Sequence, residues 1–151
     1  MLGARTALRS EEIDSMTVIH AADTPLGPNT RPEWCQTPSA GFFRMPKEGG
    51  EHDCHYHDHN ELYLISRGMA KILNAGRDHY VRERDIVCIK AGDEHDILEV
   101  YGNEDFELFW LYEPGPDWAR PGHLHRNPEK AQPHPVPAKP IPPDFPVASI
   151  H

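Results

Sequence analysis

Short apolar segments alternate with turn-forming residues along most of this chain, and this alternation constrains the fold more than any other feature. Nine segments of four to eight residues are rich in Val, Ile, Leu, Phe and Tyr, and glycine, asparagine or aspartate lies between many of them. No segment keeps a 3.6-residue period over eleven residues, so helices between the strands are not expected. The pattern predicts an all-β antiparallel sandwich or barrel. The segments are residues 16–21, 40–46, 52–57, 60–66, 68–73, 77–83, 86–90, 95–100 and 105–112.

The two ends of the chain differ from this middle part. The length of 151 residues fits one domain, and eleven of its sixteen prolines follow residue 113. Proline fixes φ and has no N–H to donate, which argues against a long helix or a central strand. We therefore predict a barrel over 16–112, an irregular segment or short helix over 1–15, and an irregular, extended tail over 113–151. On this interpretation, truncation after Pro116 leaves the barrel folded.

Charge and cysteine content narrow the classes of partner and compartment. Fifteen Lys and Arg against twenty-four Asp and Glu give 15 − 24 = −9 with histidine neutral, and nucleic acid would repel such a surface. No apolar run approaches the roughly 18 residues that span a bilayer. Three cysteines are an odd and sparse set, which is typical of a reducing compartment. We expect a cytoplasmic protein that binds neither nucleic acid nor membrane.

A histidine cluster supplies the strongest functional signal. His55 and His57 share one face if their segment is extended, with Cα atoms roughly 6.6 Å apart, and such a pair can bind one divalent ion. Glu61 would lie roughly 20 Å from His55 in a straight strand, so it can join them only if the chain folds back. The turn formers Asp58-His59-Asn60 lie at that point. A fourth ligand must come from another strand, and His95, after a Gly-Asp turn, is the natural candidate.

The other histidines carry weaker signals. His59 is expected to be the turn residue, and whether it or His52 also contributes to the site stays open. The remaining histidines lack a comparable setting and are expected to be surface or structurally satisfied residues; they are His20, His79, His123, His125, His134 and His151.

The spacing of these residues resembles the first motif of the cupin superfamily, G-x5-H-x-H-x3,4-E-x6-G. Gly49 is followed after five residues by His55 and His57, and three further residues lead to Glu61. Six more residues lead to Gly68. Every fixed position of the motif is matched.

The second cupin motif, G-x5-P-x-G-x2-H-x3-N, is matched in part. Gly92 and His95 have the expected spacing. Arg84, Lys90 and Glu99 stand where the motif has Gly, Pro and Asn, and none of the three is a ligand position. The resemblance covers roughly residues 38–112.

The resemblance implies an antiparallel double-stranded β-helix, the jelly-roll barrel, with one divalent transition metal (Fe, Mn, Ni, Co or Zn) in its open end. It carries the family's metal ligands over to His55, His57, Glu61 and His95, the same four as the spacing argument. Four protein ligands leave about two positions of an octahedral ion open for substrate or O₂. Strand alternation adds predicted neighbours of the metal: Glu61 and Tyr63 as catalytic residues, and Arg44, Tyr63, Phe106 and Trp110 as substrate-pocket residues.

These features favour a metal-dependent enzyme that acts on a small molecule, and the resemblance of a three-His, one-Glu site with an aromatic pocket to the cupin dioxygenases implies an oxygenase or dioxygenase within that class. An isomerase, epimerase or lyase that uses the metal as a Lewis acid on a sugar or on a hydroxy or keto acid is the first alternative. A non-catalytic, ligand-binding cupin is the second. Similarity to small cupins also implies a homodimer, with Trp118 and Phe145 of the tail as possible anchors on a neighbour.

Overall fold

The computed structural model describes residues 18–19, 21, 24–115 and 122–146. Seven of the predicted segments are strands: β1 (Ala40–Met45), β3 (Glu61–Arg67), β4 (Met69–Asn74), β5 (Arg77–Arg82), β6 (Ile86–Ile89), β7 (His95–Tyr101) and β8 (Phe106–Tyr112). β2 (Gly49–His52) and β9 (His134–Lys139) add two further strands, and a short 3-10 helix, η1 (Pro128–Ala131), precedes β9. The all-β jelly-roll prediction is therefore confirmed.

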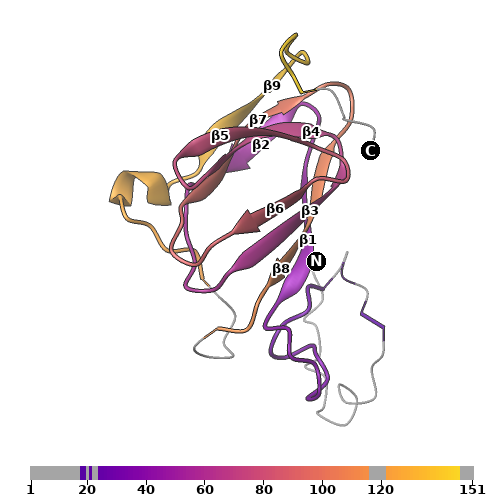
Figure 1. Cartoon of the computed structure of the whole chain (residues 1–151), viewed down its shortest axis with the longest axis vertical. Coiled ribbons are helices and arrows are strands. Elements are labelled where there is room, and N and C mark those ends of the chain that lie inside the picture. Colours follow the sequence, from indigo (N-terminus) through magenta and orange to yellow (C-terminus); the bar gives the residue numbers. More distant parts are fainter. Residues whose placement is uncertain (1–17, 20, 22–23, 116–121, 147–151) are drawn as a thin grey trace, which may run out of the picture.

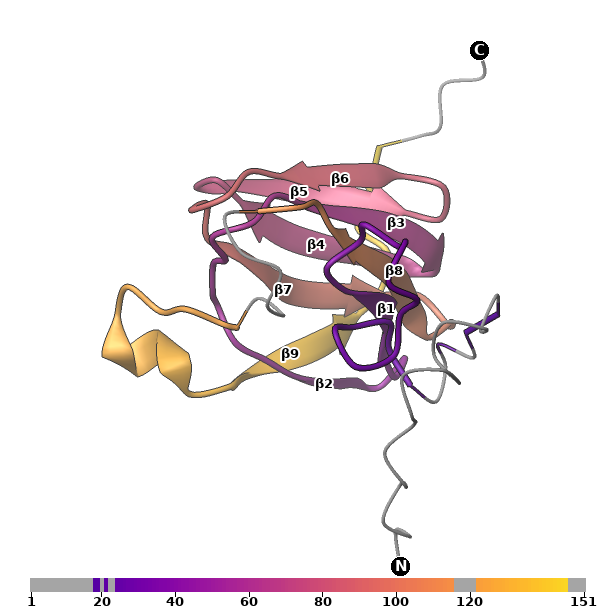
Figure 2. The same cartoon turned by 90° about the horizontal axis from the view of Figure 1, so that it is seen from below.

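Two sheets face each other and enclose the core (Figures 1 and 2). One sheet has the strand order β1-β8-β3-β6 and the other β2-β9-β7-β4-β5. All pairings are antiparallel except the short parallel contact between β7 and β9. Among the described residues, no helix is both long and apolar enough to cross a bilayer.

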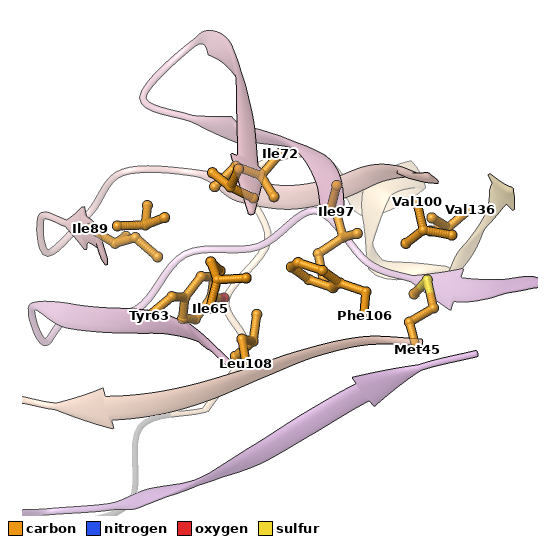
Figure 3. Close-up of a cluster of buried hydrophobic side chains, with 13 residues drawn as sticks. Met45, Tyr63, Ile65, Ile72, Ile89, Ile97, Val100, Phe106, Leu108 and Val136 are labelled. Atoms are coloured by element: carbon orange, nitrogen blue, oxygen red, sulfur yellow. The ribbon is translucent and has the colours of Figure 1, made fainter. Parts of the chain in front are cut away.

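The core lies between the two sheets, where the apolar residues of each strand meet (Figure 3). Phe106, Leu108 and Ile65 come from the four-stranded sheet and are at most 1% exposed. Ile97 of β7 and Val136 of β9 face them from the other sheet, and both are at most 2% exposed. Along β3, buried residues alternate with partly or fully exposed ones, as a sheet with one buried face requires.

The proline-rich segment contributes to the barrel, which the sequence did not predict. β9 lies between β2 and β7, pairing with β2 from His134 to Pro137 and with β7 only at Ala138 and Lys139. Successive backbone N–H groups of a strand point to opposite edges, so Pro135 and Pro137 remove donors from one edge only. The prediction that 113–151 contains no central strand is wrong for 134–139, because the β7 pairing begins beyond these prolines.

Two glycines of the first motif have a structural reason for being glycine. Gly49 has φ +92°, and a Cβ on it would lie 2.3 Å from the carbonyl oxygen of Val136. Gly68 has φ +76°, and a Cβ there would lie 2.5 Å from the carbonyl oxygen of Asp105. Both positions combine a left-handed backbone with a close approach of another chain segment, and both conditions favour glycine.

Other predicted segments differ from the structure. Residues 52–57 do not form one strand; β2 ends at His52, and only isolated bridges follow at His55 and Tyr56. Residues 18, 19 and 21 are not in a strand, and the rest of the predicted strand 16–21, the segment 1–15 and Trp118 lie outside the described residues. Phe145 packs on its own chain, with its ring centroid 5.1 Å from that of Tyr80.

An apolar row crosses the outer face of the four-stranded sheet. Phe42 pairs with Phe109, Phe109 with Leu64, and Leu64 with Ile86. Phe42, Leu64 and Ile86 are 46%, 43% and 65% exposed. The homodimer stays a prediction.

Candidate metal centre

The four predicted metal ligands lie together at one end of the barrel. Backbone hydrogen bonds in both directions join His55 to His95, with N–O distances of 3.2 and 2.8 Å. Glu61 is the first residue of β3 and pairs with Tyr112 on one side and Ile89 on the other. The side chains of all four predicted ligands, His55, His57, Glu61 and His95, are 1–3% exposed.

The turn between His57 and Glu61 brings the carboxylate back to the histidines. The Asn60 side chain accepts a hydrogen bond from the Ala91 N–H at 2.8 Å, which ties this turn to the segment before His95. As a result the Nε2 atom of His57 lies 3.4 Å from a carboxylate oxygen of Glu61. The fold-back that the sequence required for Glu61 to join the site is present.

The three histidines are oriented alike by backbone carbonyls. The Nδ1 atoms of His55, His57 and His95 lie 2.8, 2.9 and 3.1 Å from the carbonyl oxygens of Asp53, Gly122 and Asp93 respectively. A carbonyl only accepts, so each Nδ1 carries the proton and donates it, and each Nε2 keeps its lone pair. This tautomer is the one that a metal ligand needs, and a hydrogen bond of this kind is typical of metal-binding histidines.

Burial keeps these imidazoles neutral. Desolvation, together with the neighbouring His95, lowers the pKa of His55 to about 2, and desolvation lowers the pKa of His57 to about 4 although the Gly122 carbonyl opposes it. Both rings are therefore unprotonated at neutral pH, the form that binds a metal.

Two buried atoms at the centre of the cluster indicate a cation. The Oε2 atom of Glu61 and the Nε2 atom of His95 lie 3.2 Å apart, and within the described part of the chain neither atom has a hydrogen-bond partner. Two lone-pair atoms this close repel unless a cation lies between them, and buried polar atoms without a partner are costly. Glu61, His57 and His95 offer ligand atoms that all lie within 4.8 Å of one another, so these residues fit a bound metal ion.

Residues that follow the predicted barrel also take part, and the sequence did not reveal them. His123 stacks on His55 with ring centroids 3.6 Å apart and an interplanar angle of 6°. Asp53 lies 3.0 Å from the Nδ1 atom of His123 and 2.7 Å from the Nε2 atom of His125. Burial raises the pKa of Asp53, but these hydrogen bonds outweigh it and hold that pKa well below its usual range. His123 and His125 were expected to be surface or structurally satisfied histidines, and their contacts with Asp53 agree with that expectation.

A second histidine–carboxylate cluster flanks the site. Asp96, which follows His95, lies 2.8 Å from Nδ1 of His52 and 2.7 Å from Nε2 of His134. These contacts connect β2, β7 and β9, so His52 has a structural role as a partner of Asp96. Asp96 thus ties the proline-rich segment to the strand that carries His95.

His59 is buried, and a Cβ on Gly115 would lie 2.2 Å from its ring.

A cavity of about 670 Å³ opens beside the cluster. His55, Glu61 and Tyr63 line it on the metal side, and Trp110 and Tyr112 line its wall on β8. Burial, followed by the nearby Glu61, raises the pKa of Tyr63 well above 10, so its phenol stays protonated. The Tyr112 hydroxyl donates to Nε2 of His57 at 3.0 Å, and no sequence signal had distinguished this residue from its neighbours.

Two predicted pocket residues do not line the cavity. Arg44 lies on the surface with a side chain that is 65% exposed, and its Nε donates to Asp105 at 2.8 Å. Phe106 is completely buried in the core; it shares the inner face of β8 with Trp110, but the cavity lies at the far end of that strand. The predictions for Arg44 and Phe106 are corrected accordingly.

The fold and the histidine–glutamate cluster define a cupin barrel with a candidate metal centre. The family model of the cupin domain matches residues 41–112, and this barrel belongs to the cupin superfamily. β2 and Gly49 precede the cluster inside the matched region, whereas β9 and His123 lie beyond it.

A curated protein matches part of this chain at low sequence identity. The uncharacterized protein y4oW of Sinorhizobium fredii (strain NBRC 101917 / NGR234) is 30% identical over 82 residues, which cover 46% of this chain. The chain thus spans 38% of the length of that curated relative.

Two solved structures are similar in fold. The DMSP lyase DddQ from Ruegeria pomeroyi DSS-3 matches with a TM-score of 0.52 and 23% identity, over 65% of this chain and 48% of that one. Vicilin from hazelnut, Corylus avellana, matches with a TM-score of 0.51 and 14% identity, over 58% of this chain and 24% of that one.

Proposed function

We propose that this protein is a metal-dependent enzyme that acts on a small organic molecule, and that its reaction is an oxygenation. The observation that carries the proposal is the pair of unpartnered buried atoms, Glu61 Oε2 and His95 Nε2, beside a cavity of about 670 Å³. His55, His57, Glu61 and His95 would hold the ion, and its remaining coordination positions would face the cavity. A divalent transition metal bound there supplies Lewis acidity and, if it is redox-active, activation of O₂.

The chain's own residues supply orientation and exclusion of water. The backbone carbonyls that accept from each Nδ1–H fix the orientation of each imidazole. Tyr63 keeps its proton and presents a phenol beside Glu61, and Trp110 gives the cavity an apolar wall. An aromatic wall beside the metal position suits a reaction whose intermediates must be protected from water.

A second candidate is a lyase or isomerase, and Tyr63 is the observation that favours it. A protonated phenol that lines the cavity beside the metal ligands can donate a hydrogen bond to a substrate oxygen on which negative charge develops. This reaction needs the same ligands but no oxygen, so oxygen consumption separates the two candidates.

Metal content is the first test. We expect near-stoichiometric transition metal in the purified protein and a marked loss in His95→Ala, measured by elemental mass spectrometry. His79→Ala is the matched control, since His79 is exposed on β5, and it should retain the metal. If all three proteins contain no metal after incubation with Fe(II), Mn(II) and Zn(II), the proposed metal centre is wrong.

Oxygen uptake is the second test. The Fe(II)-loaded protein should consume oxygen with at least one member of a panel of small amines, alcohols and aromatic compounds, and the Zn(II)-loaded protein should not. Turnover of a substrate without oxygen uptake would instead support the lyase or isomerase.

A further inference from the structure

The hydroxyl of Tyr112 makes a hydrogen bond that is incompatible with metal binding at His57. Tyr112 is the last residue of β8, and its hydroxyl donates to the Nε2 atom of His57 at 3.0 Å. His57 is not the donor in this contact, because its ring proton is on Nδ1, which donates to the Gly122 carbonyl at 2.9 Å. Nε2 has a single lone pair, so it accepts from Tyr112 or binds a metal ion, but it cannot do both.

The position of Tyr112 in the barrel keeps its hydroxyl close to the ligand cluster. In the antiparallel pairing of β3 with β8, Tyr112 is directly opposite Glu61, and the side chains of directly opposite residues lie on the same face of a sheet. The ring centroid of Tyr112 lies 4.9 Å from that of His57. Tyr112 is only 6% exposed, so packing restrains its ring. A hydroxyl that gives up His57 must therefore find its new acceptor within a short distance.

The cavity provides such an acceptor. Tyr112 lines it together with Glu61 and Tyr63, and the remaining coordination positions of the proposed ion face the same space. A substrate oxygen at one of these positions has lone pairs and carries partial negative charge, and a phenol is a suitable donor to it. Because a buried hydroxyl is costly without an acceptor, exchanging one acceptor for another keeps the cost of metal binding low.

We propose that Tyr112 changes its hydrogen-bond acceptor when a metal ion binds His57, and that its hydroxyl then donates to the substrate atom bound at the ion. Tyr112 is on this view a substrate-binding residue on the β8 wall of the cavity, and its hydroxyl becomes available to the substrate only when the metal is in place. The inference rests on the proposed function, because it requires the metal centre.

Metal affinity tests the competition for His57. Tyr112→Phe removes the hydroxyl and keeps the ring. The parent must break the hydrogen bond to His57 before an ion binds, and a water molecule on the ion is a poor acceptor because the ion draws its electrons. The variant should therefore bind Co(II) about twofold to tenfold more tightly, the range that one net hydrogen bond provides. The affinity is measured by competition with a chelator, followed by the visible absorption of bound Co(II).

Tyr63→Phe is the matched control for metal affinity. Tyr63 is also a buried tyrosine that lines the cavity, but its hydroxyl makes no hydrogen bond to a histidine in the part of the chain that the structure describes. Its loss should leave the Co(II) affinity unchanged.

Azide tests the second acceptor, because it binds to open positions of metal ions and accepts hydrogen bonds as an anion. The Co(II)-loaded full-length protein is titrated with sodium azide and followed by visible absorption. Tyr112→Phe should bind azide at least about threefold more weakly than the parent, since hydrogen bonds to charged acceptors are stronger than neutral ones. The two expected changes thus have opposite signs. A purely structural role of Tyr112 would weaken both Co(II) and azide binding, or neither.

A measurement on the parent protein needs no variant. In ultraviolet resonance Raman spectra, the tyrosine bands report whether a phenol donates to a strong acceptor such as imidazole. Adding Zn(II) should change these bands in the parent and leave them unchanged in Tyr112→Phe. Unchanged bands in the Zn(II)-loaded parent would mean that the hydrogen bond to His57 is not broken, and the inference would be wrong.

The other outcomes separate this inference from the proposed function. Equal or weaker Co(II) binding by Tyr112→Phe means that the hydroxyl does not compete for His57. Unchanged azide affinity in the variant, or no azide binding to the Co(II)-loaded parent, means that the hydroxyl does not reach the open positions and turns elsewhere, for instance to Glu61. Each of these results overturns the inference and leaves the metal centre intact. A parent protein that binds no Co(II) refutes the proposed function itself.

Discussion

Val136 offers a direct measure of how far the proline-rich segment belongs to the barrel. Its side chain is 2% exposed and lies in the core cluster beside Val100 (Figure 3). Val136→Ala removes two methyl groups, which costs about 1.6 kcal/mol in transfer free energy and up to about 1 kcal/mol more for the cavity left behind. The free energy of unfolding should therefore fall by about 2 kcal/mol. For a chain of this size the melting temperature should then fall by about 4–8 °C.

The assay is thermal unfolding followed by circular dichroism, with metal content held equal. Val18→Ala makes the same chemical change at a side chain that is 69% exposed, and it should shift the melting temperature by less than about 2 °C. If Val136→Ala and Val18→Ala unfold at the same temperature, β9 does not pack in the core and the reasoning fails.

Three further perturbations address other parts of the structure. Truncation after Pro116 removes β9, so we expect insoluble or molten protein by near-ultraviolet circular dichroism and dye binding; a cooperative melt would contradict this. Gly49→Ala forces a Cβ to within 2.3 Å of a backbone oxygen at φ +92° and should destabilise the protein by about 1–3 kcal/mol in urea, whereas Gly27→Ala, with open space around it, should be nearly neutral. Hydrogen bonding to Lys139 is the main cause that lowers the pKa of Glu99 from 4.5 to about 2. The ionised Glu99 side chain therefore stabilises the fold above about pH 4.5, and this stabilisation is lost as the pH falls toward 2. The stability of Glu99→Gln, measured by acid unfolding, should depend less on pH in that window, and an unchanged profile would refute the assignment.

The sequence predicted the strands well where local pattern determines them. β3, β4 and β8 are short runs rich in apolar residues, and the turn formers Gly68 and Gly76 follow β3 and β4. β9 was missed because its prolines are a local signal against a central strand, whereas its place is set by Val136 in the core and by pairing with β2. Tertiary contacts of this kind leave no trace in a local pattern.

The ligand residues could be predicted because a short, fixed spacing defines them. His55, His57 and Glu61 lie within seven residues, and one turn decides whether they converge. The cavity walls could not be predicted in the same way, because they depend on how far each strand extends: Phe106 and Trp110 share a face, yet only Trp110 reaches the cavity. The stacking of His123 on His55 could not be predicted from the sequence, because the two residues lie 123 − 55 = 68 positions apart and no local pattern connects them.

The position of β9 also fixes the order in which the protein can be completed during synthesis. β2 leaves the ribosome about 80 residues before β9 (134 − 52 = 82). Until β9 has been synthesised, the edges of β2 and β7 that it will pair with have no partner strand. Unpaired edges are the places where growing chains associate wrongly. The carbonyl of Gly122 that orients His57 arrives in the same late stretch. Until this stretch has emerged, His57 lacks the carbonyl that orients it, whereas the carbonyls of Asp53 and Asp93 that orient His55 and His95 are already present.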